Sequence, residues 1–188
     1  MIDHTWTLFL DRDGVINERL PGAYIADWAD FQFRPGVLTA ITYFSTIFGR
    51  IIVVTNQQGI GKALMSEVQL NQLHGQMLKA IEAAGGRIDA IYFCPDLKSK
   101  QLNCRKPAPA MALQAQADFP AISFEHSIIV GDSLSDIEFG CNLNMKTILI
   151  ESKLDELDKI NQSTHIYINY RFQHLWEIAE AFEEDELF

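Results

Sequence analysis

Two aspartates stand two positions apart directly after an apolar run near the start of the chain, Asp11 and Asp13. Side chains two positions apart on an extended strand point to the same face. Two carboxylates placed in this way repel each other, unless a cation lies between them or one of them holds a proton. Asp132 and Asp136 can add further acidic groups. Such a cluster suits a hard divalent cation with oxygen ligands, and we expect Mg²⁺ together with a bound phosphate.

Groups that can hold a phosphate occur elsewhere in the chain. Thr55 and Asn56, together with the backbone N–H groups of a turn, can donate hydrogen bonds to phosphate oxygens, and Lys106 can neutralise their charge. Each of these groups alone is ordinary turn or cap chemistry. In combination they indicate a phosphate held between a metal ion, a lysine and a hydroxyl, facing a carboxylate.

Short apolar runs and helical patterns alternate along the chain and must position these groups. Strands are predicted at residues 6–10, 51–55, 90–93, 127–130, 147–150 and 166–168. Helices are predicted after Pro35-Gly36 and at residues 66–84, 109–117, 135–143 and 174–182. This alternation predicts an α/β fold with a mainly parallel sheet and helices on both faces. Ligands of such sheets bind beyond the carboxyl ends of the strands, where the polar groups above occur.

Composition and charge restrict the class of protein. The chain has 188 residues, of which 48% are hydrophobic, and a formal net charge of −10. We expect one domain spanning residues 1–188, since no linker or repeat divides it, and a monomer in the cytoplasm, since no signal peptide or membrane-spanning run is present. The negative charge argues against nucleic-acid or membrane partners. Three cysteines make no disulfide framework, so free thiols are expected.

Four motifs resemble those of the haloacid dehalogenase superfamily of phosphatases. They are Leu10-Asp11-Arg12-Asp13-Gly14-Val15-Ile16-Asn17, Thr55-Asn56-Gln57, Lys106, and Gly131-Asp132-Ser133-Leu134-Ser135-Asp136. More narrowly, they look like the branch that acts on heptose bisphosphates and histidinol phosphate. The resemblance implies a three-layer Rossmann-like fold, and the short spacings between the motifs leave no room for a separate cap domain.

The resemblance also implies a role for each motif residue. Asp11 would be the nucleophile that forms an aspartyl-phosphate, and Asp13 the general acid and then the general base. Asp11, Asp132 and the backbone carbonyl of Asp13 would hold Mg²⁺. Thr55 and Lys106 would stabilise the phosphoryl group in transfer.

Further residues would support this centre. Asp136 would orient Lys106 or a metal-bound water, together with Ser133. Substrate contacts are expected from Asn56, Gln57, Arg105 and Arg19. Arg105 is the strongest candidate for binding a second anionic group, because a guanidinium suits phosphate. Specificity would rest on the loops at residues 18–24 and 94–104.

One segment departs from the family pattern. Many members of the branch carry a zinc loop with four cysteine or histidine ligands. The corresponding residues here are Cys94, Asp96, Leu102 and Cys104, so two of the four ligands are missing or replaced. Structural zinc requires four such ligands, and we therefore expect no zinc here and two free cysteines in a shortened loop.

The favoured function is that of a Mg²⁺-dependent phosphomonoesterase acting on a small phosphorylated metabolite, a heptose-type sugar bisphosphate. Three alternatives stay open at this stage. The substrate could be histidinol phosphate, the phosphoryl group could pass to an acceptor other than water, or the protein could bind phosphate without catalysis.

Overall fold

The computed structural model describes residues 2–20 and 22–188, without the side chains of residues 154 and 155. Its centre is one six-stranded sheet with the order β3-β2-β1-β4-β5-β6, in which every neighbouring pair is parallel. The strands are β1 (Thr7–Leu10), β2 (Arg50–Asn56), β3 (Ala90–Cys94), β4 (Ser127–Gly131), β5 (Lys146–Ile150) and β6 (Tyr170–Phe172).

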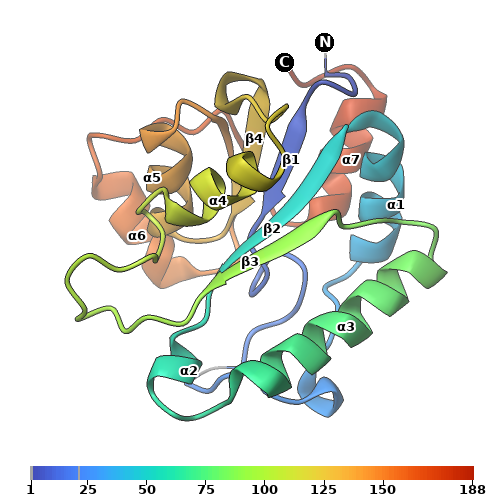
Figure 1. Ribbon diagram of the computed structural model, residues 1–188. Coiled ribbons are helices and arrows are strands. Elements are labelled where there is room, and N and C mark those ends of the chain that lie inside the picture. The colour runs from blue at the N-terminus through green and yellow to red at the C-terminus, as the bar shows by residue number, and fades with distance from the viewer. Residues whose placement is uncertain (1, 21) are drawn as a thin grey trace.

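Helices cover both faces of this sheet (Figure 1). They are α1 (Val37–Ile47), α2 (Gln58–Gly61), α3 (Glu67–Ala83), α4 (Ala110–Asp118), α5 (Leu134–Asn142), α6 (Leu154–Gln162) and α7 (Leu175–Glu183), with 3-10 turns η1 (Trp28–Asp30) and η2 (Phe124–His126). The predicted three-layer Rossmann-like fold is confirmed. Between β1 and β2 the described residues form only η1 and α1, and between β2 and β3 only α2 and α3.

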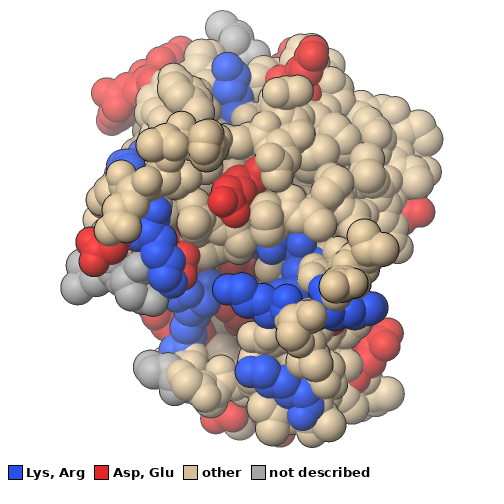
Figure 2. Space-filling view, turned by 90° about the vertical axis from the view of Figure 1, so that its left-hand side faces the viewer, with Lys and Arg blue, Asp and Glu red and all other residues tan. Residues whose placement is uncertain are grey.

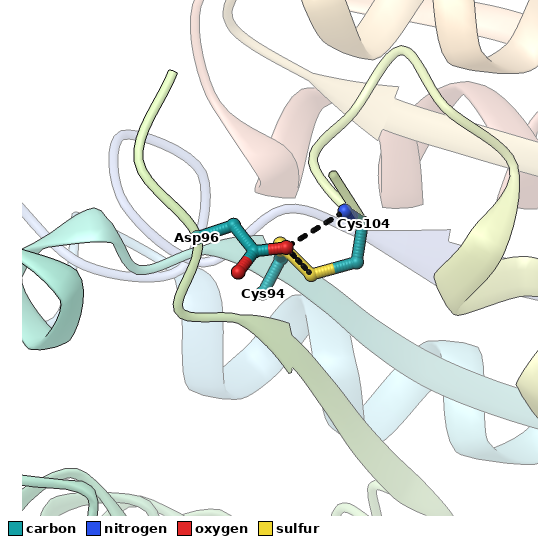
Figure 3. A group of neighbouring side chains, drawn as sticks. All are labelled: Cys94, Asp96 and Cys104. Atoms are coloured by element: carbon teal, nitrogen blue, oxygen red, sulfur yellow. Dashed lines mark hydrogen bonds between the residues drawn. A yellow bond between two sulfur atoms is a disulfide. The ribbon is translucent and has the colours of Figure 1, made fainter. Parts of the chain in front are cut away.

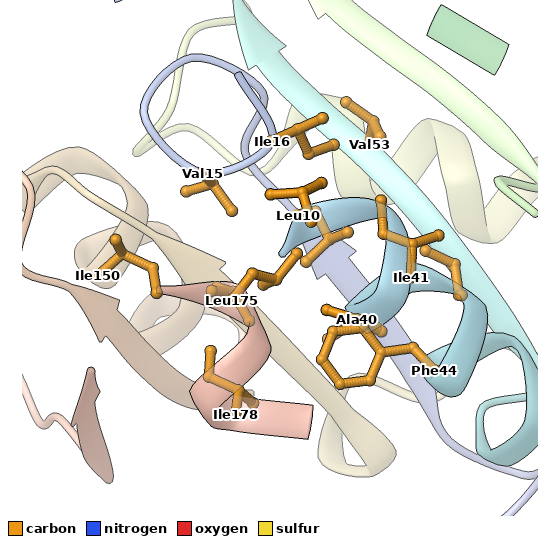
Figure 4. Close-up of a cluster of buried hydrophobic side chains, with 14 of the residues drawn as sticks. Leu10, Val15, Ile16, Ala40, Ile41, Phe44, Val53, Ile150, Leu175 and Ile178 are labelled. Carbon is orange, nitrogen blue, oxygen red and sulfur yellow. The ribbon is translucent and has the colours of Figure 1, made fainter. Parts of the chain in front are cut away.

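The central strand β1 contributes to the core on both sides of the sheet. Leu8 and Leu10 pack in a cluster with buried side chains of α1, α3 and α7. Phe9, which points the other way, packs in a second cluster with buried residues of α4 and α5. This alternation along an apolar strand is what burial on both faces requires. Figure 4 shows the first cluster, where Leu10 meets Ile41 of α1 and Leu175 of α7.

Helix α3 lies where a helix was predicted, at residues 66–84, with Ser66 and Ala84 as its caps. The Ser66 hydroxyl accepts a hydrogen bond from the backbone N–H of Gln69, and the Gln69 side chain reaches back to Ser66 in a capping box. The pattern of apolar residues at spacings of three and four along this helix predicts a buried stripe of Leu70, Leu73, Met77, Ile81 and Ala84; the first four are buried, whereas Ala84, the C-cap, is exposed. A polar residue, His74, is buried in the same stripe.

One prediction near the C-terminus was wrong, and one helix there was not predicted. The last strand is β6 at Tyr170–Phe172, not residues 166–168. Ile166 and Ile168 instead pack against the small cluster between α5, α6 and β5. Asn169 holds the approach to β6, because its N–H donates to the Thr147 carbonyl at 2.9 Å and its side chain accepts from the Thr147 N–H. Helix α6 was not predicted, because polar residues dominate its sequence.

The register brings the carboxyl ends of the central strands together. Leu10, the last residue of β1, is level with Val53 of β2 and Val130 of β4. The residues that follow these positions therefore meet at one edge of the sheet. No helix in the described part of the chain is long and apolar enough to cross a membrane.

Candidate active site

Lys106 lies at the centre of a buried group of charges beyond β1, β2 and β4. Its Nζ atom lies 2.9 Å from Asp11 Oδ1 and 2.6 Å from Asp136 Oδ1, and it donates to the Val54 carbonyl at 2.6 Å. All three charged side chains are buried. Lys106 therefore joins the residue that follows β1 to the first turn of α5.

Asp136 is held on its other oxygen by the turn that begins α5. Its Oδ2 atom accepts hydrogen bonds from the backbone N–H of Asp132 and Ser133 and from the Ser133 hydroxyl, at 3.2, 3.0 and 2.6 Å. These contacts, with the ion pair to Lys106, favour the charged carboxylate, and they hold the pKa of Asp136 below its usual value despite its burial. Asp136 is thus placed to orient Lys106, and Ser133 to orient Asp136.

Asp132 places another buried carboxylate close to Asp11. Its Oδ2 atom accepts a hydrogen bond from the Ser152 hydroxyl at 2.8 Å, and its Oδ1 atom accepts one from Arg19. The same Arg19 guanidinium lies 3.8 Å from Asp11 Oδ2. The Asp132 carboxylate packs directly against the backbone of Gly14. A glycine is needed at this position, because its φ is +94° and a Cβ there would overlap the Asp132 carboxylate.

The residues present fit a divalent cation. Carboxylate oxygens of Asp11, Asp132 and Asp136 lie within 4.8 Å of one another. Burial, strengthened by the charges of Asp136 and Asp132, raises the pKa of Asp11 to about 6 even though Lys106 and Arg19 oppose the shift. Three carboxyl groups, of Asp11, Asp132 and Asp136, face two cations here, Lys106 and Arg19, and the Arg19 guanidinium already places positive charge between Asp11 and Asp132. Asp136 is occupied by Lys106 and by N–H donors, which leaves Asp11 and Asp132 as the carboxylates to hold a metal.

The Asp13 carboxylate accepts hydrogen bonds from residues other than those that bind Asp11 and Asp132. Its Oδ1 atom accepts from Arg12 at 2.7 Å and from Asn17 at 3.0 Å, and its Oδ2 atom accepts from Gln57 at 2.8 Å. Burial alone would raise its pKa, but the charge of Arg12 and these hydrogen bonds lower the pKa of Asp13 to about 2. In this arrangement Asp13 is a carboxylate at neutral pH, in the protonation state of a base.

The three residues at the end of β2 have different contacts. The Thr55 hydroxyl accepts from the Gln57 side chain at 2.9 Å, so Gln57 bridges Thr55 and Asp13. Asn56 clamps the backbone of Lys106: its Oδ1 accepts the Lys106 N–H at 3.0 Å and its amide donates to the Lys106 carbonyl at 3.3 Å. All three line the cavity described below. Asn56 and Gln57, which were predicted to contact substrate, also position Lys106 and Asp13.

A cavity of about 730 Å³ opens over this centre. Figure 2 shows Lys and Arg side chains on both sides of a hollow in the surface, with acidic side chains at its floor. The basic residues that line it are Arg19, Lys98, Arg105, Lys106, Lys153 and Lys159. Arg19 and Lys98 come from the two predicted specificity loops, Arg105 and Lys106 directly follow the second loop, and Lys153 and Lys159 come from the N-cap and the body of α6. In the loop at residues 18–24, residue 21 lies outside the described part.

The expectation of free thiols in the loop before Lys106 was wrong. Cys94 and Cys104 form a disulfide, with their Cα atoms 5.5 Å apart (Figure 3). Asp96 lies beside it, and its Oδ2 atom accepts the Cys104 N–H at 3.2 Å. The cysteine count alone could not reveal this pair, because Cys94 ends a strand and the chain returns to it only after a ten-residue excursion. Cys141 is not paired.

The structure brings together every residue that the motifs singled out, and it adds three contacts that the motifs did not assign. Arg12 and Asn17 bind Asp13, and Ser152 binds Asp132. Arg12 and Asn17 stand inside the first motif, and Ser152 follows the predicted strand at residues 147–150. The signals that could have identified them are therefore membership of the first motif for Arg12 and Asn17, and a position just after a strand for Ser152.

Comparison with known proteins identifies the family. A family model described as HAD-hydrolase-like matches residues 103–177. A D-glycero-α-D-manno-heptose-1,7-bisphosphate 7-phosphatase from Mycobacterium tuberculosis (strain CDC 1551 / Oshkosh) is 41% identical over 140 residues, which cover 74% of each chain. A phosphatase of the same name from Campylobacter jejuni is 35% identical over 184 residues, which cover 97% of this chain and 99% of the relative.

A solved structure agrees with these relatives. It is a D,D-heptose 1,7-bisphosphate phosphatase from B. bronchiseptica in complex with magnesium and phosphate, with a TM-score of 0.85 and 26% sequence identity. The match covers 96% of this chain and 99% of that one. The resemblance stated from the four motifs is thereby confirmed. The chain belongs to the haloacid dehalogenase-like hydrolase family and is one of its phosphatases.

Proposed function

We propose that the chain is a Mg²⁺-dependent phosphatase that removes the 7-phosphate from a D-glycero-D-manno-heptose 1,7-bisphosphate. One observation carries the proposal: Lys106 ties Asp11 to Asp136 in a buried carboxylate cluster at the floor of a cavity with a basic rim. Asp11, Asp132 and the Asp13 carbonyl would hold Mg²⁺. When bound, the ion supplies positive charge to the phosphoryl oxygens.

Asp11 is the nucleophile in this proposal. Its carboxylate oxygen bonds to phosphorus, while the bond from phosphorus to the sugar oxygen breaks and the sugar oxygen takes a proton from Asp13. Lys106 and Thr55 balance and bind the negative charge on the phosphoryl group in transfer. The product at this point is an aspartyl-phosphate on Asp11 and a free sugar alcohol.

Hydrolysis completes the cycle with Asp13 as base. A water oxygen bonds to phosphorus, its proton passes to Asp13, and the bond from phosphorus to Asp11 breaks to release inorganic phosphate. The arrangement of Asp13 in the free protein, with a pKa of about 2, suits this second step. Donation of a proton in the first step requires Asp13 to carry one, and the negative charge of a bound phosphate next to Asp13 favours that protonated form.

The basic rim supports a bisphosphate substrate. Arg105 lies beside the loop closed by the disulfide, where its guanidinium contacts the Asp96 carbonyl at 3.3 Å. Lys153 lines the cavity from the turn before α6. A second phosphate is attracted by these charges, whereas a second group with a positive charge is repelled. This favours a sugar bisphosphate over histidinol phosphate.

Phosphate release from a panel of esters tests the proposal. The panel contains the α and β anomers of heptose 1,7-bisphosphate, heptose 7-phosphate, a hexose bisphosphate and histidinol phosphate. We expect the highest kcat/KM for heptose 1,7-bisphosphate, with the α anomer preferred because both curated relatives described above are named for it. A preference for histidinol phosphate would contradict the proposed substrate.

A second measurement tests the nucleophile. Asp11→Asn should abolish Mg²⁺-dependent phosphate release, and acid quenching of the wild type during turnover should trap a phosphorylated protein that Asp11→Asn does not form. Addition of alcohols as acceptors distinguishes hydrolysis from transfer. Persistent activity in Asp11→Asn would show that the nucleophile is a different residue.

A further inference from the structure

Arg12 is a fully buried cation next to the proposed catalytic pair, with a relative exposure of 0%. Its Nη2 atom donates to both oxygens of Asp13, at 2.7 and 2.9 Å, and its Nε atom donates to Oδ1 at 3.2 Å. The remaining Nη1 atom lies 3.2 Å from Nε2 of His74, which stands 62 residues later on α3. Arg12 thus connects Asp13 to a helix on one face of the sheet.

The contact between Arg12 and His74 defines the state of the imidazole. A guanidinium has only donors, so Nε2 of His74 must accept the hydrogen bond and the ring proton must lie on Nδ1. Burial and the charge of Arg12 lower the pKa of His74 to about 3, so the ring is neutral at neutral pH. His74 also packs beside Phe93, with ring centroids 6.2 Å apart. The imidazole is therefore a fixed acceptor and takes no part in proton transfer.

A structural role alone does not explain where these groups point. A buried cation and a histidine in an apolar stripe both cost free energy unless they are paired. An apolar residue at position 74 would continue the stripe formed by Leu70, Leu73 and Met77. Instead, three of the four donor contacts of Arg12 end on the Asp13 carboxylate, and the fourth ends on His74.

We propose that Arg12 and His74 are positioning residues that fix the orientation of the Asp13 carboxylate toward the leaving oxygen and the attacking water. The inference rests on the proposed function, in which Asp13 moves the proton in both steps. His74 holds the far side of the guanidinium, and the guanidinium holds both oxygens of Asp13. Misplacing a reacting group by about 1 Å can cost about 100-fold in rate, so a contact this distant from the substrate can still affect catalysis.

Three substitutions separate positioning from simple stability. His74→Leu removes the acceptor and leaves Arg12 Nη1 unpaired, whereas His74→Gln retains an oxygen that can accept from it. His165→Leu, at an exposed histidine that does not line the cavity, is the matched control. His74→Asn, whose shorter amide does not reach the guanidinium, replaces His74→Leu if the latter does not fold. Each variant is first checked for cooperative unfolding.

The readout compares two leaving groups. An alkyl ester such as a sugar phosphate requires a proton on its leaving oxygen, whereas 4-nitrophenyl phosphate has a leaving group that departs without one. We expect His74→Leu to lower kcat/KM for the alkyl ester by about tenfold or more, with a much smaller loss for 4-nitrophenyl phosphate. His74→Gln should restore most of the loss, and His165→Leu should match the wild type.

The outcomes separate this inference from the proposed function. A folded His74→Leu variant that loses activity equally on both esters, or on neither, would overturn the positioning role, as would a folded His74→Gln that restores nothing. A wild-type protein without phosphatase activity, or an active Asp11→Asn variant, would instead overturn the proposed function itself.

Discussion

The buried His74 makes stability depend on pH in a direction that can be measured. In the unfolded chain a histidine titrates near its usual pKa of about 6.5, whereas burial and Arg12 lower the pKa of His74 in the folded protein to about 3. Between these values the unfolded state binds a proton that the folded state does not. The contribution of His74 to stability is therefore fully present above about pH 6.5, and it is lost as the pH falls toward 3.

The size of the effect follows from the same shift. Each pH unit below about 6.5 favours the unfolded state by about 1.4 kcal/mol, so lowering the pH from 7 to 5 costs about 2 kcal/mol through His74 alone. His74→Gln has no titrating group at this position, so its free energy of unfolding lacks this pH-dependent contribution. We therefore expect the free energy of unfolding to fall by about 2 kcal/mol more in the wild type than in His74→Gln over this pH interval.

Urea denaturation at pH 7 and pH 5, with EDTA present throughout, measures the difference. Other groups titrate in both proteins, including Asp11 with its raised pKa, so their contributions largely cancel when the two losses are compared. The stability of the variant at pH 7 does not enter the comparison. Equal losses in the two proteins would show that His74 titrates normally in the folded state, and the account of its burial next to Arg12 would be wrong.

Three other predictions follow from the site. Lys106→Met leaves Asp11 and Asp136 buried without their cation, and in EDTA we expect a loss of about 3–5 kcal/mol in urea denaturation, together with loss of activity. Mg²⁺ at 100 times its dissociation constant should stabilise the wild type by about 2.7 kcal/mol in thermal unfolding, and Asp132→Asn should lose most of this gain. Arg105→Gln should raise KM for heptose 1,7-bisphosphate in steady-state assays but not for heptose 7-phosphate. An equal rise in KM for both esters would show that Arg105 does not bind the second phosphate.

The convergence of the motif residues could be predicted from the sequence because parallel strands place their carboxyl ends at one edge. Asp11, Thr55 and Asp132 each follow an apolar run, and topology alone brings them together. The contacts that orient them could not be predicted in the same way. His74 stands at a stripe position of α3, and no local pattern shows which partner a buried polar side chain meets on another element.

The errors of prediction have the same physical origin. The disulfide joins a strand end to a loop whose path depends on tertiary contacts, such as the one between Asp96 and the Cys104 N–H. Ile166 and Ile168 have strand-forming side chains, but packing against α5 and α6 takes them into a loop. In both cases contacts outside the residues' own local segment decided the structure.

In the free site the pKa values of Asp11 and Asp13 are shifted in opposite directions. Burial and neighbouring carboxylates raise the pKa of Asp11 to about 6, whereas Arg12, Asn17 and Gln57 lower the pKa of Asp13 to about 2. The reaction needs the opposite order of pKa values, because Asp11 must be charged as the nucleophile and Asp13 must be protonated as the acid. A divalent cation near Asp11 favours its charged form, and a phosphate dianion next to Asp13 favours the protonated form there. Bound metal and substrate would therefore shift the pKa of each carboxyl group toward the protonation state that the reaction requires.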